Sequence, residues 1–180
     1  MDANFEPVVL TARNGRVVRV RAVTPADEED ILQAFERLGS QSRYMRFMHA
    51  IREVNTRRLR EVLASFPAKG LALAATVPAE DGIDIVGAAT LILGADPTTC
   101  EFAISVADDW AGAGLGRSLM TLLIEAARRR GLARMEGFVL ADNAPMLRLA
   151  QKLGFESKRD PDDFGVRVCR LALQPSAPPA

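Results

Sequence analysis

Val106-Ala-Asp-Asp-Trp-Ala-Gly-Ala-Gly-Leu-Gly-Arg-Ser-Leu-Met120 leads from an apolar, strand-like segment through three alternating glycines into the start of a helix. Gly112, Gly114 and Gly116 can adopt backbone angles that a Cβ forbids, so successive N–H groups can turn toward one anion. The helix that follows adds the positive end of its dipole and its unpaired first-turn donors. The stretch therefore predicts a phosphate-binding turn, with a tight strand-to-helix connection as the alternative.

The segments on both sides of this turn have clear periods. In Cys100–Val106 the apolar side chains alternate with Glu101, Ala103 and Ser105, which places a carboxylate and two small side chains on one face. From Leu115 an apolar stripe recurs at helical spacing, and Arg128-Arg-Arg130 followed by Gly131 predicts the end of that helix. A strand, a glycine turn and a long helix thus form the centre of the fold.

The rest of the chain carries further element signals. Thr24-Pro25-Ala26-Asp27 predicts a helix start, and Asp142-Asn143 with Pro145 predicts another. Strands are expected at 16–21, 71–77, 83–93, 134–140, 155–159 and 166–173, and short helices at 40–50 and 55–66. We interpret residues 1–14 as an N-terminal extension, 15–174 as one domain and the proline-rich 175–180 as a disordered tail.

Composition narrows the range of functions. The 180 residues include 23 Lys plus Arg and 23 Asp plus Glu, so no global field favours nucleic acid or an anionic membrane. The longest apolar stretches are far shorter than a membrane span, and no signal segment opens the chain, so we expect a cytoplasmic protein. Cys100 and Cys169 stand in strand-like contexts without further metal-type ligands nearby, which predicts buried free thiols and no metal site.

The spacing of the glycines differs from that of the two common nucleotide-binding loops. A dinucleotide fingerprint needs G-x-G-x-x-G within a parallel strand–helix–strand unit, whereas the strand here follows hairpins. A Walker loop ends in G-K-[ST], but Gly116-Arg117-Ser118 has arginine in place of lysine and lacks the upstream spacing. Neither of these folds is expected.

From about Arg19 to Leu173 the sequence resembles the GNAT superfamily of acyl-CoA-dependent N-acyltransferases. The most specific part runs from Glu101 to Phe155: a strand, V-x-x-D-W-A-G-A-G-L-G-R, a helix, a strand, N-A-P-M, a helix and K-L-G-F. The resemblance implies an α/β (α+β) GNAT fold, with a mixed, mostly antiparallel central sheet of about six to seven strands flanked by helices. It also implies acetyl-CoA as co-substrate, without a metal.

The same resemblance assigns roles to individual residues. Main-chain N–H groups would hold the CoA pyrophosphate, and they belong to Ala111, Gly112, Ala113, Gly114, Leu115, Gly116 and Arg117. The pantetheine arm would lie between splayed strands, at Ile104, Ser105 and Val106 and at Gly137–Val139, and Asn143 would contact pantetheine or an ordered water. Ala111 replaces the glutamine or arginine usual at the start of the family loop, which removes a side chain but leaves the main chain intact.

Two N-terminal segments are similar to the Pat-type protein lysine acetyltransferases of that superfamily: Arg21-Ala-Val-Thr-Pro-Ala-Asp27 and Ser42-Arg-Tyr-Met-Arg-Phe47. This similarity implies a protein lysine as acceptor, with an acyl-CoA synthetase as one candidate partner. Glu101 matches the glutamate of those enzymes and would act as general base while the amine attacks the thioester directly in a ternary complex. A solvated strand carboxylate is the alternative for Glu101.

Other residues leave the acceptor side open. Ala150 stands where many GNAT enzymes have a tyrosine that acts as acid to the leaving thiolate, so no general acid is expected. The sole histidine, His49, is more typical of a structural residue than of a catalytic one. The seven arginines from Arg37 to Arg60 form either solvated helix faces or a basic surface for an acidic partner or the ligand's phosphates. A small-amine acceptor and a CoA-binding sensor without turnover remain as alternative functions, and the oligomeric state is open.

Overall fold

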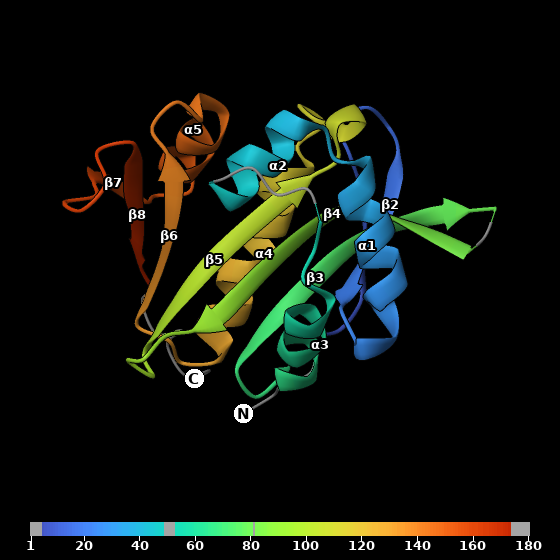
Figure 1. The fold of residues 1–180 in the computed structure, drawn as a ribbon, viewed down its shortest axis with the longest axis horizontal. Helices are drawn as coiled ribbons and strands as arrows, with labels where there is room; N and C mark the ends of the chain where they lie inside the picture. The colour runs from blue at the N-terminus through green and yellow to red at the C-terminus, as the bar shows by residue number, and fades with distance from the viewer. Residues whose placement is uncertain (1–4, 49–52, 81, 174–180) are drawn as a thin grey trace, which may run out of the picture.

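The computed structural model describes residues 5–48, 53–80 and 82–173, and its elements follow the sequence signals closely (Figure 1). The strands in this part of the chain are β1 (Val8–Thr11), β2 (Val17–Ala22), β3 (Gly70–Ala79), β4 (Gly82–Leu93), β5 (Thr99–Val106), β6 (Arg134–Leu140), β7 (Glu156–Arg159) and β8 (Val166–Ala172). The α-helices are α1 (Glu28–Arg37), α2 (Ser40–Phe47), α3 (Thr56–Ser65), α4 (Leu115–Arg129) and α5 (Ala144–Lys152). Short 3₁₀ turns at Pro25–Asp27 and Asp108–Trp110 precede α1 and the glycine turn.

The described strands form one eight-stranded sheet in the order β1-β2-β3-β4-β5-β6-β8-β7. All neighbours are antiparallel except β5 and β6, which are parallel. The predicted fold class is therefore confirmed, with one strand beyond the six to seven expected. That strand is β1, inside the range interpreted as an N-terminal extension. Four residues are too few to display a period, but pairing of Val8–Thr11 with Val17–Val20 makes them the edge of the sheet.

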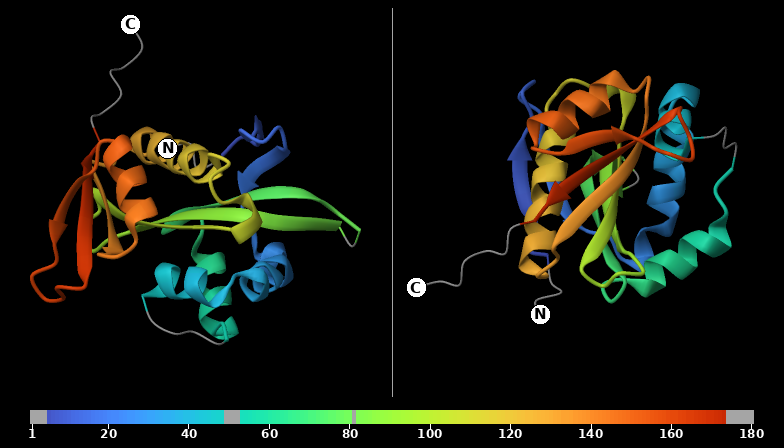
Figure 2. Two further views of the ribbon diagram at one scale, coloured as in Figure 1. Left: turned by 90° about the horizontal axis from the view of Figure 1, so that it is seen from above. Right: turned by 90° about the vertical axis from the view of Figure 1, so that its left-hand side faces the viewer.

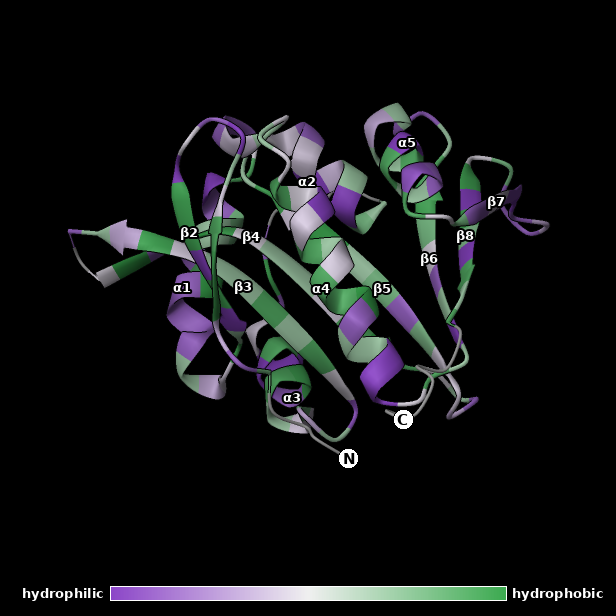
Figure 3. Ribbon diagram, turned by 180° about the vertical axis from the view of Figure 1, so that it is seen from behind, coloured by the Kyte–Doolittle hydropathy of each residue, from purple (hydrophilic) through white to green (hydrophobic). Residues whose placement is uncertain are grey.

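Helices cover both faces of the sheet (Figure 2). The helices α1, α2 and α3 lie on one face, and α4 and α5 lie on the other. The inner side of α4 buries Leu119, Met120 and Leu123 in the same core as Leu73 of β3 and Leu91 of β4, and Figure 3 shows the hydrophobic strands beneath this helix. Each such side chain contributes roughly 1.5–3 kcal/mol when fully buried, so α4 and the turn before it are firmly fixed to the sheet.

The predicted ends of α4 and the predicted start of α5 are confirmed. Gly131 follows α4 with a φ of +73°, and its N–H donates to the Arg128 carbonyl. The Asn143 side chain accepts a hydrogen bond from the Met146 N–H at 3.2 Å, which caps α5. These caps set where the chain leaves the sheet and returns to it.

The start of the first helix differs slightly from the prediction. The Asp27 carboxylate accepts hydrogen bonds from the Thr24 N–H at 2.7 Å and from the Arg21 Nη1 at 2.9 Å. This buried, fully engaged carboxylate holds the first turn in a 3₁₀ conformation, and α1 begins only at Glu28. The capping pattern was interpreted correctly as a helix start, but tertiary contact with β2 shapes the turn.

Cys100 in β5 and Cys169 in β8 are buried free thiols, as predicted. Burial raises the pKa of Cys100 to about 12. Among the described residues, no helix combines the length and the hydropathy required to cross a membrane.

Candidate active site

The glycine turn lies between the end of β5 and the N-terminus of α4. After the 3₁₀ turn at Asp108–Trp110, Gly112 and Gly114 adopt φ angles of +76° and +84°. Such left-handed angles cost an L-residue roughly 1–2 kcal/mol, which explains glycine at both positions. A Cβ at Gly112 would meet no atom within 4 Å, so the backbone angle alone selects glycine there. The turn presents bare main chain at the positive end of the helix dipole.

Two of the seven predicted N–H donors are used inside the turn. The Ala111 N–H donates to the Asp108 carbonyl at 3.2 Å, and the Ala113 N–H donates to the Trp110 carbonyl at 3.3 Å. The donors without an acceptor among the described residues belong to Gly112, Gly114, Leu115, Gly116 and Arg117. These groups can serve a phosphate, whereas the N–H groups of Ala111 and Ala113 first hold the turn in shape.

The hairpin of β1 and β2 supports the turn from the side. The Arg13 N–H donates to the Ala113 carbonyl at 2.9 Å, and the Arg13 Nε would lie 3.2 Å from a Cβ on Gly114. The Arg16 guanidinium stacks on the buried Trp110 ring, 3.6 Å from its centroid. Arg13 thus adds a positive charge beside the N-terminus of α4. Arg13 could not be identified from the sequence because it lies far from the turn along the chain, within the segment interpreted as an extension.

Asp108 connects the turn to helix α2 on the opposite face of the sheet. Its carboxylate accepts hydrogen bonds from the Ser42 hydroxyl at 2.5 Å and from the Gly39 N–H at 3.3 Å. A Cβ at Gly39 would stand 2.6 Å from the Asp108 Oδ2, so a larger residue there would displace this carboxylate. These contacts position α2 over the end of β5.

Strands β5 and β6 are paired only where they begin, over Thr99–Glu101 and Arg134–Glu136. Beyond this point they diverge, and β5 continues along β4 while β6 continues along β8 (Figure 1). The Ala107 N–H donates to the Val86 carbonyl of β4. Because every second residue of an antiparallel strand bonds to the same neighbour, the main-chain groups of Ile104 and Val106 are directed toward β6, and those of Ser105 toward β4.

Aromatic packing accompanies the start of this divergence. The Phe102 ring fills the space that a Cβ on Gly137 would need, so ring and glycine are in close contact across β5 and β6. Phe102 also packs edge-to-face on Phe155, with centroids 5.1 Å apart. Asn143, which caps α5, lies at the end of the turn that follows β6. The sheet is thus held together on one side of Glu101 and separated on the other.

Glu101 stands on the last paired position of β5, next to Glu136 on β6. Burial raises the pKa of Glu101, the Glu136 charge raises it further, and the Arg46 charge from α2 opposes both. The Arg170 Nε on β8 pairs with Glu136 at 3.1 Å, which holds this second carboxylate in place. Sequence periodicity placed Glu101 on the small-residue face but could not identify Glu136 or Arg46 as its neighbours.

Three other residues named from the sequence are His49, Ala150 and Tyr44. His49 lies outside the described residues. Ala150 is buried within α5, and Tyr44 on α2 is 44% exposed. Within the described ranges, no group of three or more His, Cys, Asp or Glu side chains could hold a metal ion.

Comparison with known sequences identifies the family. The model of the acetyltransferase (GNAT) family matches residues 33–155. An acetyltransferase of Pseudomonas aeruginosa is 34% identical over 160 residues, which cover 89% of this chain and 86% of that protein. The acetyltransferase Pat of Mycolicibacterium smegmatis is 30% identical over 175 residues, or 97% of this chain. The chain spans about half of the length of Pat, 51%.

Solved structures give the same result for the fold. The GNAT domain of S. lividans PAT has a TM-score of 0.83 at 23% identity, covering 93% of this chain and 97% of that domain. The yncA protein of Salmonella typhimurium, solved with its cofactor acetyl-CoA, has a TM-score of 0.69 at 25% identity, covering 91% of this chain and 98% of yncA. With the family model matched over more than half of its length, the chain belongs to the GNAT family and is an acetyltransferase.

Proposed function

We propose that the protein transfers the acetyl group of acetyl-CoA to the side-chain amine of a protein lysine, with Glu101 as general base. One observation carries the proposal: Glu101 stands at the last paired position before β5 and β6 separate, on the strand that ends in the phosphate-type turn. From Glu101 to Val106 the strand spans about 16 Å. The turn can therefore hold one end of an extended donor while its acyl end lies near the carboxylate.

The donor site follows from the unpaired main-chain groups. The N–H groups of Gly112, Gly114 and the first turn of α4 would receive the pyrophosphate, with the Arg13 charge beside them. The main-chain groups of Ile104 and Val106 would receive the amides of the pantetheine arm, and Asn143 would contact the same arm or a water. In this scheme Ser105 contributes through its side chain, on the Glu101 face of the sheet.

The proposed reaction is a direct acyl transfer in a ternary complex. The neutral amine attacks the thioester carbonyl, a C–N bond forms, the C–S bond breaks and CoA leaves as a thiolate. Glu101 takes the proton lost by the amine, directly or through a water. Lysine is mostly protonated at neutral pH, so a carboxylate with a raised pKa is a better-matched base than an ordinary one. No side chain is assigned as acid for the thiolate.

The acceptor assignment has two kinds of support. The relative Pat and the GNAT domain of PAT match the chain over nearly its whole length. In addition, α2 and α3 carry arginines and present no carboxylate cluster, within the described residues, that would enclose a small cationic amine. An acyl-CoA synthetase is one candidate substrate protein. A small amine as acceptor, or acyl-CoA binding without turnover, would be the alternatives.

The test is an acetyl-CoA turnover assay against candidate proteins, lysine peptides and small amines, with mass-spectrometric mapping of the products. We expect N-acetyl-lysine, and a loss of turnover in Glu101→Gln of about 10²- to 10⁴-fold with unchanged CoA binding. Acetylation of small amines alone would contradict the protein acceptor. If Glu101→Gln keeps wild-type turnover at every pH, Glu101 is not the base.

A further inference from the structure

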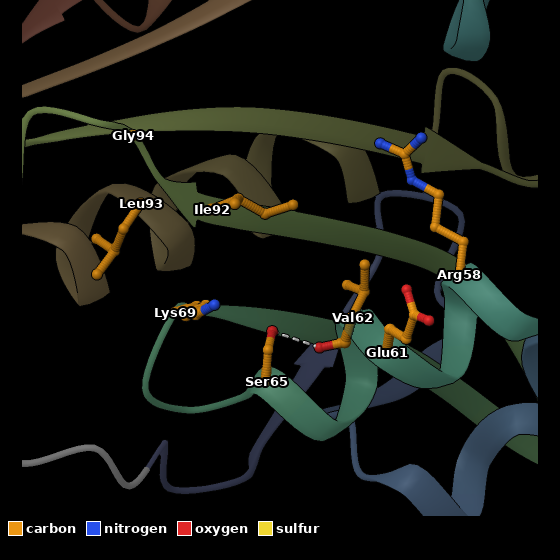
Figure 4. A pocket seen from close by; sticks show the side chains of 8 residues that line it. All are labelled: Arg58, Glu61, Val62, Ser65, Lys69, Ile92, Leu93 and Gly94. Atoms are coloured by element: carbon orange, nitrogen blue, oxygen red, sulfur yellow. Dashed lines mark hydrogen bonds between the residues drawn. The ribbon is translucent and has the colours of Figure 1, made fainter.

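A groove on the Glu101 face runs between α3 and the end of β4. It has a volume of about 470 Å³ and is lined by Arg58, Glu61 and Val62 of α3, by Lys69 before β3, and by Ile92 of β4. Figure 4 shows Arg58 and Lys69 toward its two ends, with Val62 and Ile92 between them. The two cations thus flank an apolar middle section.

The groove continues directly from the proposed base. Ile92 is the register partner of Glu101 on the neighbouring strand, so the two side chains stand side by side on one face. Ile92 is 43% exposed, which is unusual for a strand isoleucine and marks an apolar surface beside the carboxylate. When a substrate polypeptide brings a lysine to Glu101, the residues next to that lysine would lie over this surface.

The two cations of the groove have no ion-pair partner among the described residues that line it. Among the described residues, no carboxylate or other acceptor pairs with the Arg58 guanidinium or the Lys69 ammonium. The one lining carboxylate, Glu61, is already paired with Arg57, Nε to Oε1 at 3.1 Å. The other arginine of this helix, Arg60, is paired with Glu28. Arg58 and Lys69 therefore leave the groove with a net positive charge.

We propose that this groove binds an acidic peptide segment next to the acceptor lysine. Carboxylates of the peptide would pair with Arg58 and Lys69, and its aliphatic groups would pack on Ile92 and Val62. The inference rests on the proposed function for the position of the lysine. The open shape fits a polypeptide that passes along the surface, and the two separated cations match carboxylates on two residues of the same strand. The groove thereby selects lysines in acidic surroundings.

The experiment compares two labelled peptides that have one central lysine flanked on both sides by aspartates or by asparagines, which have the same shape without the charge. Binding to the CoA-loaded protein is measured by fluorescence anisotropy, and acetylation is measured as kcat/KM. We expect the aspartate peptide to be favoured about tenfold in both assays at low salt, and less as salt screens the charges. The double variant Arg58→Gln, Lys69→Gln should lose this preference.

The double variant Arg128→Gln, Arg129→Gln is the matched control because it also removes two exposed cations, which lie on α4, on the opposite face of the sheet. This variant should keep the preference, and all variants should keep the wild-type KM for acetyl-CoA. If the preference for the aspartate peptide survives in the Arg58→Gln, Lys69→Gln variant, or is absent in the wild type, the groove is not a site for acidic peptides. If the peptides bind as predicted but no lysine is acetylated, the proposed function is contradicted, and the groove is still supported as a peptide-binding site.

Discussion

At the scale of single residues, the pH dependence of turnover should report the charges around Glu101. Glu101, the proposed base, would be active when ionised, so the rate should rise with pH as it loses its proton. Burial and the Glu136 charge raise the pKa of Glu101, whereas Arg46 lowers it. Glu136→Gln should therefore move the acidic limb of the kcat profile to lower pH, and Arg46→Gln should move it to higher pH.

Opposite shifts distinguish this electrostatic role from a loss of folding, which would lower the rate at every pH. The profile of Glu101→Gln should lack the acidic limb altogether. Arg170→Gln serves as a further check because its pair with Glu136 holds that carboxylate near Glu101. Identical profiles for Glu136→Gln and Arg46→Gln would show that neither charge acts on the base.

Arg13 offers a second prediction for a single residue. Its side chain lies beside Gly114 at the N-terminus of α4, where the proposed pyrophosphate site is. Arg13→Ala should raise the KM for acetyl-CoA several-fold, with little change in kcat, since the charge acts on donor binding and not on the acyl end. The main-chain bond from Arg13 to Ala113 does not depend on the side chain, so the turn should keep its shape.

The same measurement on Arg19→Ala provides the control. Arg19 is an exposed cation of the same hairpin, on β2, and its loss changes the net charge equally. Its KM for acetyl-CoA should equal that of the wild type. If Arg13→Ala and Arg19→Ala change the KM for acetyl-CoA equally, the effect comes from net charge, and Arg13 is not part of the donor site.

At the scale of elements, the Phe102 ring lies in close contact with Gly137 just beyond the last paired residues of β5 and β6. Gly137→Ala places a methyl group where the ring lies, and such overpacking costs about 1–3 kcal/mol. In a chain of this length the melting temperature should fall by several degrees. Phe102→Leu in the same chain should relieve the overlap, so the free energies of unfolding of the two substitutions should not be additive.

Gly112→Ala is the comparison for this prediction. A Cβ there meets no atom, and only the left-handed backbone angle opposes it. Its cost should be similar, about 1–2 kcal/mol, but Phe102→Leu should not reduce it. Additive free energies for Gly137→Ala and Phe102→Leu would mean that ring and strand adjust independently.

The elements themselves could largely be predicted from the sequence. The long helix after the glycine turn and the strand at 134–140 were placed correctly because caps, glycines and periodicity all agree there. The strand β1 was missed because its stability comes from pairing with β2, which leaves no local pattern in four residues. The neighbours of Glu101 and the contact of Arg13 with the turn were missed for a related reason: they join positions that only the folded sheet brings together.

At the scale of the whole molecule, the sheet consists of two parts joined over a short stretch. Strands β1 to β5 form one part, and β6, β8 and β7 form the other, and the two parts pair only over Thr99–Glu101 and Arg134–Glu136. Each part contains one buried thiol, Cys100 in β5 and Cys169 in β8. The C-terminal part is smaller and pairs with the rest at its β6 edge alone, so it should open more readily than the larger part.

Thiol labelling can test this division. Neither thiol reacts while buried, so labelling by a maleimide should follow opening, and Cys169 in a Cys100→Ala chain should react faster than Cys100 in a Cys169→Ala chain. A CoA analogue without the thiol would contact both parts, through the glycine turn and through Asn143, and should therefore suppress the separation. At 100 times its Kd the analogue should slow labelling of Cys169 about 100-fold. If the analogue slows both thiols equally and they react at equal rates without it, the sheet opens as one unit, and the donor stabilises the fold without bridging two parts.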